Sequence, residues 1–224
     1  MNHPAEIMSP KTRAEVILKR LRERYPAPEG ALHWASPWEL LVSTVLAAQC
    51  TDVRVNQVTP EFFRRWPTIP SLAAASEGEV EGVIRSTGFF RNKAKNLVAA
   101  ARRITKEHQG QVPETMEGLL SLPGVARKTA NIVLSNAFGR HEGIAVDTHV
   151  RRLSFRLGLT SSTDPKKIEL DLMPLFPQQA WGEINHLLVW HGRDVCQARN
   201  PKCRGCLLRD ICPQCGLPDP RTAS

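Results

Sequence analysis

One lysine of this chain stands where its amine could act as a nucleophile. Lys128 follows the stretch LPGVAR, in which Pro123 and Gly124 predict a tight turn between two helices. Gly124 can adopt the positive φ that such a turn needs. Lys128 then falls in the first turn of the second helix, against the positive end of the helix dipole. A lysine there either contacts phosphate or, with its pKa lowered by desolvation, forms a Schiff base.

The backbone of the same hairpin suits an anion. The N–H groups of the hairpin and of the first turn of the next helix lack partners within the helix, so they can bind a phosphate whatever the base sequence. An ordinary connection between two packed helices has the same composition. The hairpin alone therefore leaves phosphate binding and simple packing open.

Asp147 is a second candidate for chemistry. It precedes THVRRLSFRLGL, a helical pattern that ends at Gly158. An aspartate there is a good N-cap, worth about 1 kcal/mol to the helix, and capping is the simpler interpretation. The helix dipole and the N–H groups also keep such a carboxylate ionised. Asp147 could therefore both cap the helix and stabilise positive charge that develops on a substrate.

Five of the six cysteines lie between Cys196 and Cys215. In an intracellular chain this crowding indicates metal ligation rather than disulfides. Two C-x-x-C pairs, CRGC and CPQC, would suit zinc, although the five residues between them are few for zinc knuckles. The pattern C-x6-C-x2-C-x5-C covers Cys196, Cys203, Cys206 and Cys212, leaves Cys215 over, and would suit a [4Fe–4S] cluster. Spacing alone leaves both open.

Composition and charge narrow the class of protein. The chain has 224 residues, 42% of them hydrophobic, which suits one large or two small globular domains. Lys and Arg outnumber Asp and Glu by 30 to 22, a formal net charge of +8. That excess favours a nucleic acid as partner, or serves solubility alone. The chain has no secretory signal pattern and no apolar run of roughly 18 residues, so we expect a cytoplasmic protein without membrane contact.

Helical periodicity runs through nearly the whole chain, and no convincing alternating run predicts a strand. The sequence therefore predicts an all-α fold. The stretch WELLVSTVLAAQ is apolar nearly all round and should be buried on every face. The segment after about Val195 buries too little apolar area to order itself, and a metal centre would supply the missing cohesion. Helix starts are expected at Ser9-Pro10, Ser36-Pro37, Asp52 as N-cap, Ser76 with Glu79 as capping box, Asn92, Asp164-Pro165 and Gln178.

The stretch LPGVARKTAN, followed by AVDTHV at Ala145 to Val150, resembles the helix–hairpin–helix and Gly/Pro…Asp signature of the endonuclease III family of DNA glycosylases. LLVSTVLAAQCTDVRVN, GFFRNKAKNL and the cysteine spacing are similar to that family in the same order, from about Ala14 to Asp210. The resemblance implies an all-α, two-domain helix–hairpin–helix DNA glycosylase fold. A six-helix barrel domain would span residues 30–140, and an iron–sulfur cluster domain would combine residues 1–29 and 141–224.

The resemblance also implies a function, that of a bifunctional DNA glycosylase/AP lyase of base excision repair acting on oxidised pyrimidines. Lys128 would attack the sugar and form a Schiff base, Asp147 would assist it from across a cleft, and β-elimination would cut 3′ to the abasic site. The partner would be double-stranded DNA with damaged bases or abasic sites, bound by a monomer associated with the nucleoid if the protein is bacterial. The ligands of a [4Fe–4S] cluster would be Cys196, Cys203, Cys206 and Cys212.

Several expected DNA contacts come from the resemblance. Gln49 would fill the hole left by a flipped-out base, and Phe89 would wedge into the opposite strand. From the residues alone, Gln49 could equally be a polar residue at a helix end, and Phe89 could equally lie in the core. The expected DNA-binding residues are Gln49, Phe89, Gly124, Ala126, Arg127 and His149.

Two positions depart from the family's usual sequence. Ala126 stands where the family usually has glycine; if that position needs a positive φ or the close approach of a phosphate, alanine costs about 1 kcal/mol and could weaken DNA binding. Phe89 stands where leucine is common and makes a bulkier wedge. Two other functions stay open: a non-catalytic iron–sulfur DNA-binding protein, and a monofunctional glycosylase that releases the base without nicking the strand.

Overall fold

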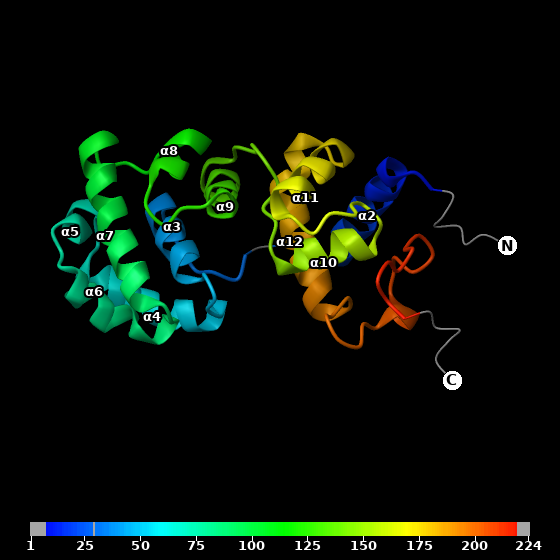
Figure 1. Cartoon of the computed structure of the whole chain (residues 1–224), viewed down its shortest axis with the longest axis horizontal. Coiled ribbons are helices and arrows are strands. Elements are labelled where there is room, and N and C mark those ends of the chain that lie inside the picture. Colours follow the sequence, from blue (N-terminus) through cyan, green and yellow to red (C-terminus); the bar gives the residue numbers. More distant parts are fainter. Residues whose placement is uncertain (1–7, 29, 219–224) are drawn as a thin grey trace. The chain divides into compact units, whose positions relative to one another are not determined.

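The computed structural model describes residues 8–28 and 30–218. These residues form helices, turns and irregular segments, and no strand occurs among them, which confirms the all-α prediction. The chain divides into a compact unit of residues Gly30–Glu142, the hairpin unit, and a second, the cysteine unit, made from the described residues on either side (Figure 1). Residues 1–7, 29 and 219–224, which the predicted cluster domain includes, lie outside the described residues.

The hairpin unit is a set of helices around one apolar core. Buried Phe62, Leu97 and Leu134 contribute to that core from three different helices. Its longest helix packs against two short ones that precede it in the chain. The elements are α3 (Pro37–Leu46), α4 (Asp52–Arg65), α5 (Ile69–Ala73), α6 (Glu77–Ile84), η1 (Arg85–Thr87), α7 (Phe90–Glu107), α8 (Met116–Ser121) and α9 (Arg127–Phe138).

The cysteine unit joins the start of the chain to its end. Its first helix packs against its last long one, and both contribute to a separate apolar core that contains Ile17, Leu153 and Leu187. The elements are α2 (Pro10–Arg24), α10 (Thr148–Arg156), α11 (Pro165–Leu172), η2 (Met173–Leu175), η3 (Gln178–Ala180), α12 (Trp181–Asp194) and η4 (Cys203–Gly205). No helix among the described residues is long and apolar enough to cross a membrane.

Side-chain caps begin most helices where the sequence indicates. Ser9, Ser36 and Asp164 are N-caps, and Ser76 forms the predicted capping box with Glu79. The prediction that Asp52 caps its helix is wrong. Thr51 Oγ1 accepts the hydrogen bond from the Arg54 N–H at 3.3 Å, because the extended backbone that an N-cap needs falls one residue earlier. Asp52 is the first helical residue, where its charge still suits the dipole.

Two helices begin differently from the prediction, whereas α3 is buried along most of its length, as predicted. Trp38 and every residue of Leu40–Leu46 in α3 are buried. α7 begins at Phe90, two residues before the predicted Asn92, because the chain turns sharply at Gly88 and Phe89, which both have positive φ. The helix expected from Gln178 begins as a 3₁₀ turn and becomes α-helical at Trp181.

Candidate active site and cysteine pocket

The hairpin between α8 and α9 has the tight geometry that Pro123 and Gly124 predict. The Val125 N–H donates to the Leu122 carbonyl at 3.2 Å, which closes the turn, and Gly124 has φ 78°. A Cβ at Gly124 would lie 2.8 Å from the Asn96 Cβ, so no side chain fits there whatever the backbone angle. Both the positive φ and the lack of room for a Cβ therefore favour glycine at this position.

Ala126 is the N-cap of α9, and it does not need a positive φ. Its backbone is extended, with φ −95° and ψ 167°, so alanine is unstrained where the family usually has glycine. A methyl group accepts no hydrogen bond, unlike the Ser and Asp side chains that cap α2, α10 and α11. No side-chain cap therefore occupies the start of α9, which is the kind of helix terminus that can bind a ligand such as phosphate.

Lys128 lies in the first turn of α9, as predicted, but its side chain is exposed rather than desolvated; its neighbour Arg127 is half-buried. Asp147 is the half-buried N-cap of α10, and its Oδ1 accepts the Val150 N–H at 2.8 Å, which confirms the capping prediction. Lys128 belongs to the hairpin unit and Asp147 to the cysteine unit. That the two face each other stays a prediction.

His149 lies on the first turn of α10, two residues from Asp147. Arg152 Nη2 donates to His149 Nδ1 at 3.1 Å, which requires that nitrogen to be unprotonated. Burial lowers the pKa of His149, against the opposite effect of Asp147. A neutral imidazole with its proton on Nε2 follows, so this ring can donate one hydrogen bond.

Several residues that position the Asp147 segment were not predicted from the sequence. Asn185 Nδ2 on α12 donates to the Ala145 carbonyl at 2.7 Å, just before the VDTH motif. Arg152 donates from Nε and Nη2 to the Cys196 carbonyl, at 3.2 and 3.1 Å. A polar residue at a buried position of a helical pattern, such as Asn185, was the available signal.

Gln49 and Phe89 are both exposed, in turns of the hairpin unit. The alternative that Phe89 lies in the core is wrong, because its side chain is 66% exposed. Gln49 lies beyond the end of α3 rather than in its last turn. Both have positive φ, 53° for Gln49 and 47° for Phe89, a backbone region that is costly for residues other than glycine.

Four cysteines line one cavity in the cysteine unit. They are the four of the C-x6-C-x2-C-x5-C pattern, and of the described cysteines Cys215 and Cys50 lie outside the lining. Among the described residues, no three His, Cys, Asp or Glu side chains are grouped to hold a single metal ion. The thiols therefore lie around a cavity rather than around the position of a single ion. The cysteines that line it are Cys196, Cys203, Cys206 and Cys212.

Three thiols of this cavity, those of Cys203, Cys206 and Cys212, resist ionisation. Burial, with a smaller contribution from the neighbouring cysteines, raises the pKa of Cys212 to about 12. Burial likewise raises the pKa values of Cys203 and Cys206. Thiols that are buried and mutually repulsive as thiolates need positive charge among them to ionise, which bound iron or zinc supplies. This donor set therefore fits a metal–thiolate group.

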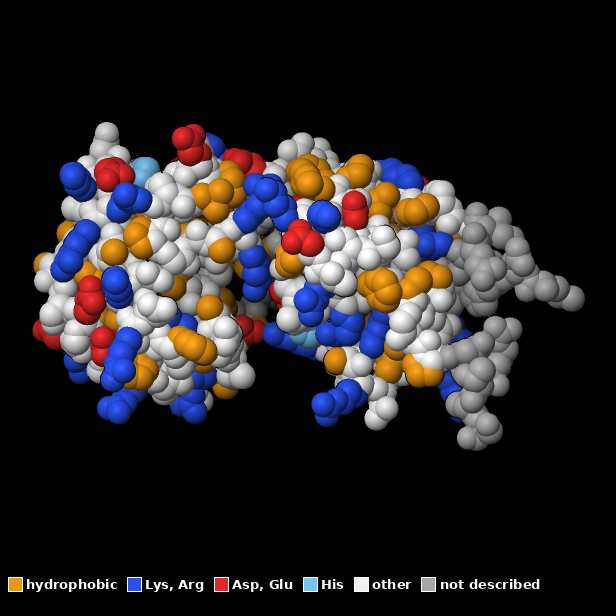
Figure 2. All heavy atoms as spheres, in the orientation of Figure 1, with side chains coloured by type: hydrophobic (Ala, Val, Ile, Leu, Met, Phe, Trp, Pro, Cys, Tyr) orange, Lys and Arg blue, Asp and Glu red, His pale blue; other side chains and the backbone are white. Residues whose placement is uncertain are grey.

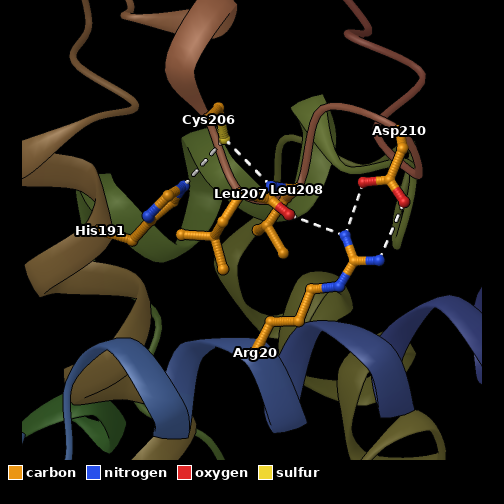
Figure 3. Close-up of polar contacts among 6 residues, drawn as sticks. All are labelled: Arg20, His191, Cys206, Leu207, Leu208 and Asp210. Carbon is orange, nitrogen blue, oxygen red and sulfur yellow. Dashed lines mark hydrogen bonds and ion pairs between the residues drawn. The ribbon is translucent and has the colours of Figure 1, made fainter.

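Polar contacts also fix the sulfur atoms and their loop (Figure 3). The Leu208 N–H donates to Cys206 Sγ at 3.4 Å, and His191 Nε2 lies 3.5 Å from the same sulfur. From α2, Arg20 donates to the Leu207 carbonyl at 2.7 Å and to both Asp210 carboxylate oxygens at 2.5 and 2.9 Å. The segment between Cys206 and Cys212 is thereby tied to a helix from the start of the chain.

Comparisons with known proteins agree on one family. Residues 42–178 match the family described as HhH-GPD superfamily base excision DNA repair protein. The chain is similar to endonuclease III of Synechocystis sp., 53% identical over 208 residues, which are 93% of this chain and 95% of that protein. It is also similar to endonuclease III of Escherichia coli K12, 41% identical over 199 residues, 88% of this chain and 92% of that protein.

Solved structures show the same likeness. The structure of a trapped endonuclease III–DNA covalent intermediate superposes with a TM-score of 0.87 and 38% identity, covering 92% of this chain and 97% of that one. A thermostable thymine-DNA glycosylase, 22% identical, shares the fold with a TM-score of 0.82, over 90% of this chain and 96% of that one. The chain belongs to the endonuclease III family of helix–hairpin–helix base excision repair proteins, and it is a DNA glycosylase/AP lyase.

Proposed function

We propose that Lys128 performs the chemistry on a nucleotide flipped out of duplex DNA. The observation that supports this proposal is the position of Lys128, whose side chain is exposed in the first turn of α9, directly after the hairpin. Its nitrogen bonds to C1′ while the bond from C1′ to the base breaks, and the base leaves with the electron pair and takes up a proton. The sugar ring opens to a Schiff base on Lys128. Loss of a C2′ proton then expels the 3′ phosphate, and water releases the lysine.

Asp147 is proposed to stabilise the positive charge that develops on the sugar as the base departs. Its cap to Val150 uses Oδ1 and fixes the orientation of the carboxylate. The contact from Asn185 to Ala145 holds the backbone just before it. A charge held in place in this way stabilises a transition state without reorganising during the reaction.

The hairpin is proposed to bind the DNA backbone. The N–H groups at the start of α9, preceded by Gly124 and Ala126, offer an anion site, and Arg127 and His149 add contacts to DNA. Lys and Arg side chains lie on the visible face of each unit (Figure 2), consistent with the formal charge of +8. Gln49 fills the vacated base position and Phe89 wedges into the opposite strand. One copy of the chain would act on one lesion, an oxidised pyrimidine.

The cysteine unit is proposed to hold a [4Fe–4S] cluster. The four thiols around one cavity support this assignment over zinc on the CRGC and CPQC pairs, because the latter would require Cys215. When bound, the cluster would supply the cohesion that this loop lacks. On this view the hairpin unit corresponds to the barrel domain of residues 30–140, and the cysteine unit to the cluster domain of residues 1–29 and 141–224.

Borohydride trapping tests the role of Lys128. Duplex DNA with one abasic site would be incubated with the wild type, Lys128→Ala and, as a control, Lys106→Ala, an exposed lysine near the far end of α7. We expect a covalent protein–DNA adduct from the wild type and Lys106→Ala, and none from Lys128→Ala although it still binds the DNA. An adduct from Lys128→Ala would assign the imine to another amine.

The same assay on the wild type tests the family's activity directly, because the two alternative functions predict different products. Base release without an adduct or a nick, from folded protein that binds DNA, would indicate a monofunctional glycosylase. Binding without base release would indicate a non-catalytic protein. The colour and iron content of the preparation test the cluster separately, since zinc-loaded colourless protein would overturn that assignment.

A further inference from the structure

We propose that Lys93 is a positioning residue that holds together the two turns carrying Gln49 and Phe89. This inference rests on the proposed roles of those two side chains in DNA. Lys93 lies on α7 with only 5% of its surface exposed, and it carries no part of the proposed chemistry.

The ammonium group of Lys93 forms hydrogen bonds with the backbone that leads into each of the two turns. Its Nζ donates to the Leu46 carbonyl at 2.8 Å and to the Thr87 carbonyl at 2.8 Å. Leu46 is the last residue of α3, three residues before Gln49, and Thr87 ends η1, two residues before Phe89. One nitrogen thus joins two turns that are about forty residues apart in sequence.

Both turns need such a restraint because both are strained. Gln49 and Phe89 have φ of 53° and 47°, and a residue other than glycine keeps that conformation only where its surroundings impose it. Two further hydrogen bonds hold the turn around Phe89. Thr87 is buried with its hydroxyl bonded to the Ile84 carbonyl at 2.8 Å, while the Lys93 N–H donates to the Phe89 carbonyl at 3.1 Å.

Burying a lysine at this position carries a desolvation penalty. Burial lowers the pKa of Lys93, although Cys50 opposes the shift. An apolar side chain of the same length would pack without that desolvation penalty. What only the ammonium provides is two strong hydrogen bonds, directed at the ends of the two segments that would enter the DNA.

Fluorescence of 2-aminopurine, placed opposite an uncleavable abasic-site analogue in duplex DNA, reports the insertion of the two side chains. We expect Gln49→Ala and Phe89→Ala each to reduce the fluorescence change on binding. Lys93→Met should reduce it as well and weaken binding about tenfold, because the turns must then be ordered on the DNA. In a Gln49→Ala/Phe89→Ala background, Lys93→Met should weaken binding by less than about twofold further.

Ile104→Ala is the matched control, since Ile104 is fully buried in the same core and on the same helix. It should lower Tm but keep the fluorescence change and the amide hydrogen-exchange protection of both turns, whereas Lys93→Met should lose that protection in the free protein. If Lys93→Met does not fold, Lys93→Arg keeps the charge and the donors. Its planar, bulkier head cannot take the place of the compact ammonium without displacing the two carbonyls, so a partial loss of the fluorescence change is expected.

The outcomes separate this inference from the function on which it rests. If Gln49→Ala and Phe89→Ala leave the fluorescence change intact, the proposed DNA contacts are wrong and the role of Lys93 falls with them. If those two variants lose the change while folded Lys93→Met, or Lys93→Arg in its place, keeps it, only the inference about Lys93 is overturned. Additive losses in the triple variant would likewise reduce Lys93 to a packing residue.

Discussion

The hairpin and the cysteine loop are both irregular segments that follow a helix, yet they are held by different means. The hairpin has five residues, and Leu122 and Val125 anchor it in the core of its unit. The loop from Cys196 to Cys215 contributes Leu208 and Ile211 as its buried apolar anchors. Elsewhere it relies on hydrogen bonds from arginines of distant helices and, on the proposed function, on the cluster that its thiols would bind.

This difference indicates which segment can form on its own. A short turn with local hydrogen bonds and two apolar anchors needs only its own unit. A loop held by guanidinium groups and thiols gains most of its order from its ligand. We therefore expect the stability of the cysteine loop, but not that of the hairpin, to depend on a bound cluster.

The largest expected effect comes from the cavity thiols. Cys212→Ser should lose bound iron and colour, and amide exchange in the cysteine loop should become fast while the hairpin stays protected. Cys215→Ser, which leaves the four cavity thiols intact, should retain iron and protection. Equal loss of iron in both variants would favour the two C-x-x-C pairs instead.

Gly124→Ala should be the most damaging single change in the hairpin. The added Cβ meets Asn96 and the backbone has φ 78°, so we expect destabilisation by about 2 kcal/mol and weaker DNA binding. Gly139→Ala is the control, because Gly139 also has positive φ but a Cβ there would meet nothing within 4 Å. Denaturant unfolding measures both; equal losses would mean that the contact with Asn96 is without consequence.

Arg20→Met tests the polar support of the cysteine loop. We expect a loss of about 1 kcal/mol, larger than for Arg22→Met, because Arg22 pairs with Glu183 outside the loop. Arg20 lowers the pKa of Asp210, so this stabilisation is present above the ordinary carboxyl pKa of about 3.9 and is lost as pH falls below it. Unfolding curves of wild type and variant should therefore converge in acid.

The smallest effect on stability, and one of opposite sign, is expected at Ala126. Ala126→Asp supplies the N-cap side chain that α9 lacks, so it should raise stability by about 0.5 kcal/mol. The same carboxylate would occupy the proposed phosphate site and weaken DNA binding. Ala126→Ser should stabilise without the repulsive charge. Unchanged DNA affinity of Ala126→Asp would argue that phosphate does not bind at this helix start.

Local signals in the sequence were sufficient for much of the fold. Ser36-Pro37, Ser76 with Glu79, and Asp164-Pro165 begin helices because capping involves residues within one turn of each other. The error at Asp52 arose because two adjacent residues could both cap, and backbone geometry selected Thr51. The conformation of Ala126 could not be read from its type, since alanine fits both a helix and an extended N-cap.

The sequence alone determines the types and order of the chemical groups: an amine after a Pro-Gly turn, a capping carboxylate, and four thiols at cluster spacing. The residues that support these groups could not be predicted from the sequence, because most of their contacts join residues far apart in the chain. Lys93 bonds to Leu46 and Thr87, and Arg20 bonds to Leu207 and Asp210, through contacts that exist only when helices pack. Periodicity shows that a side chain is buried, but only packing shows which polar group it meets there.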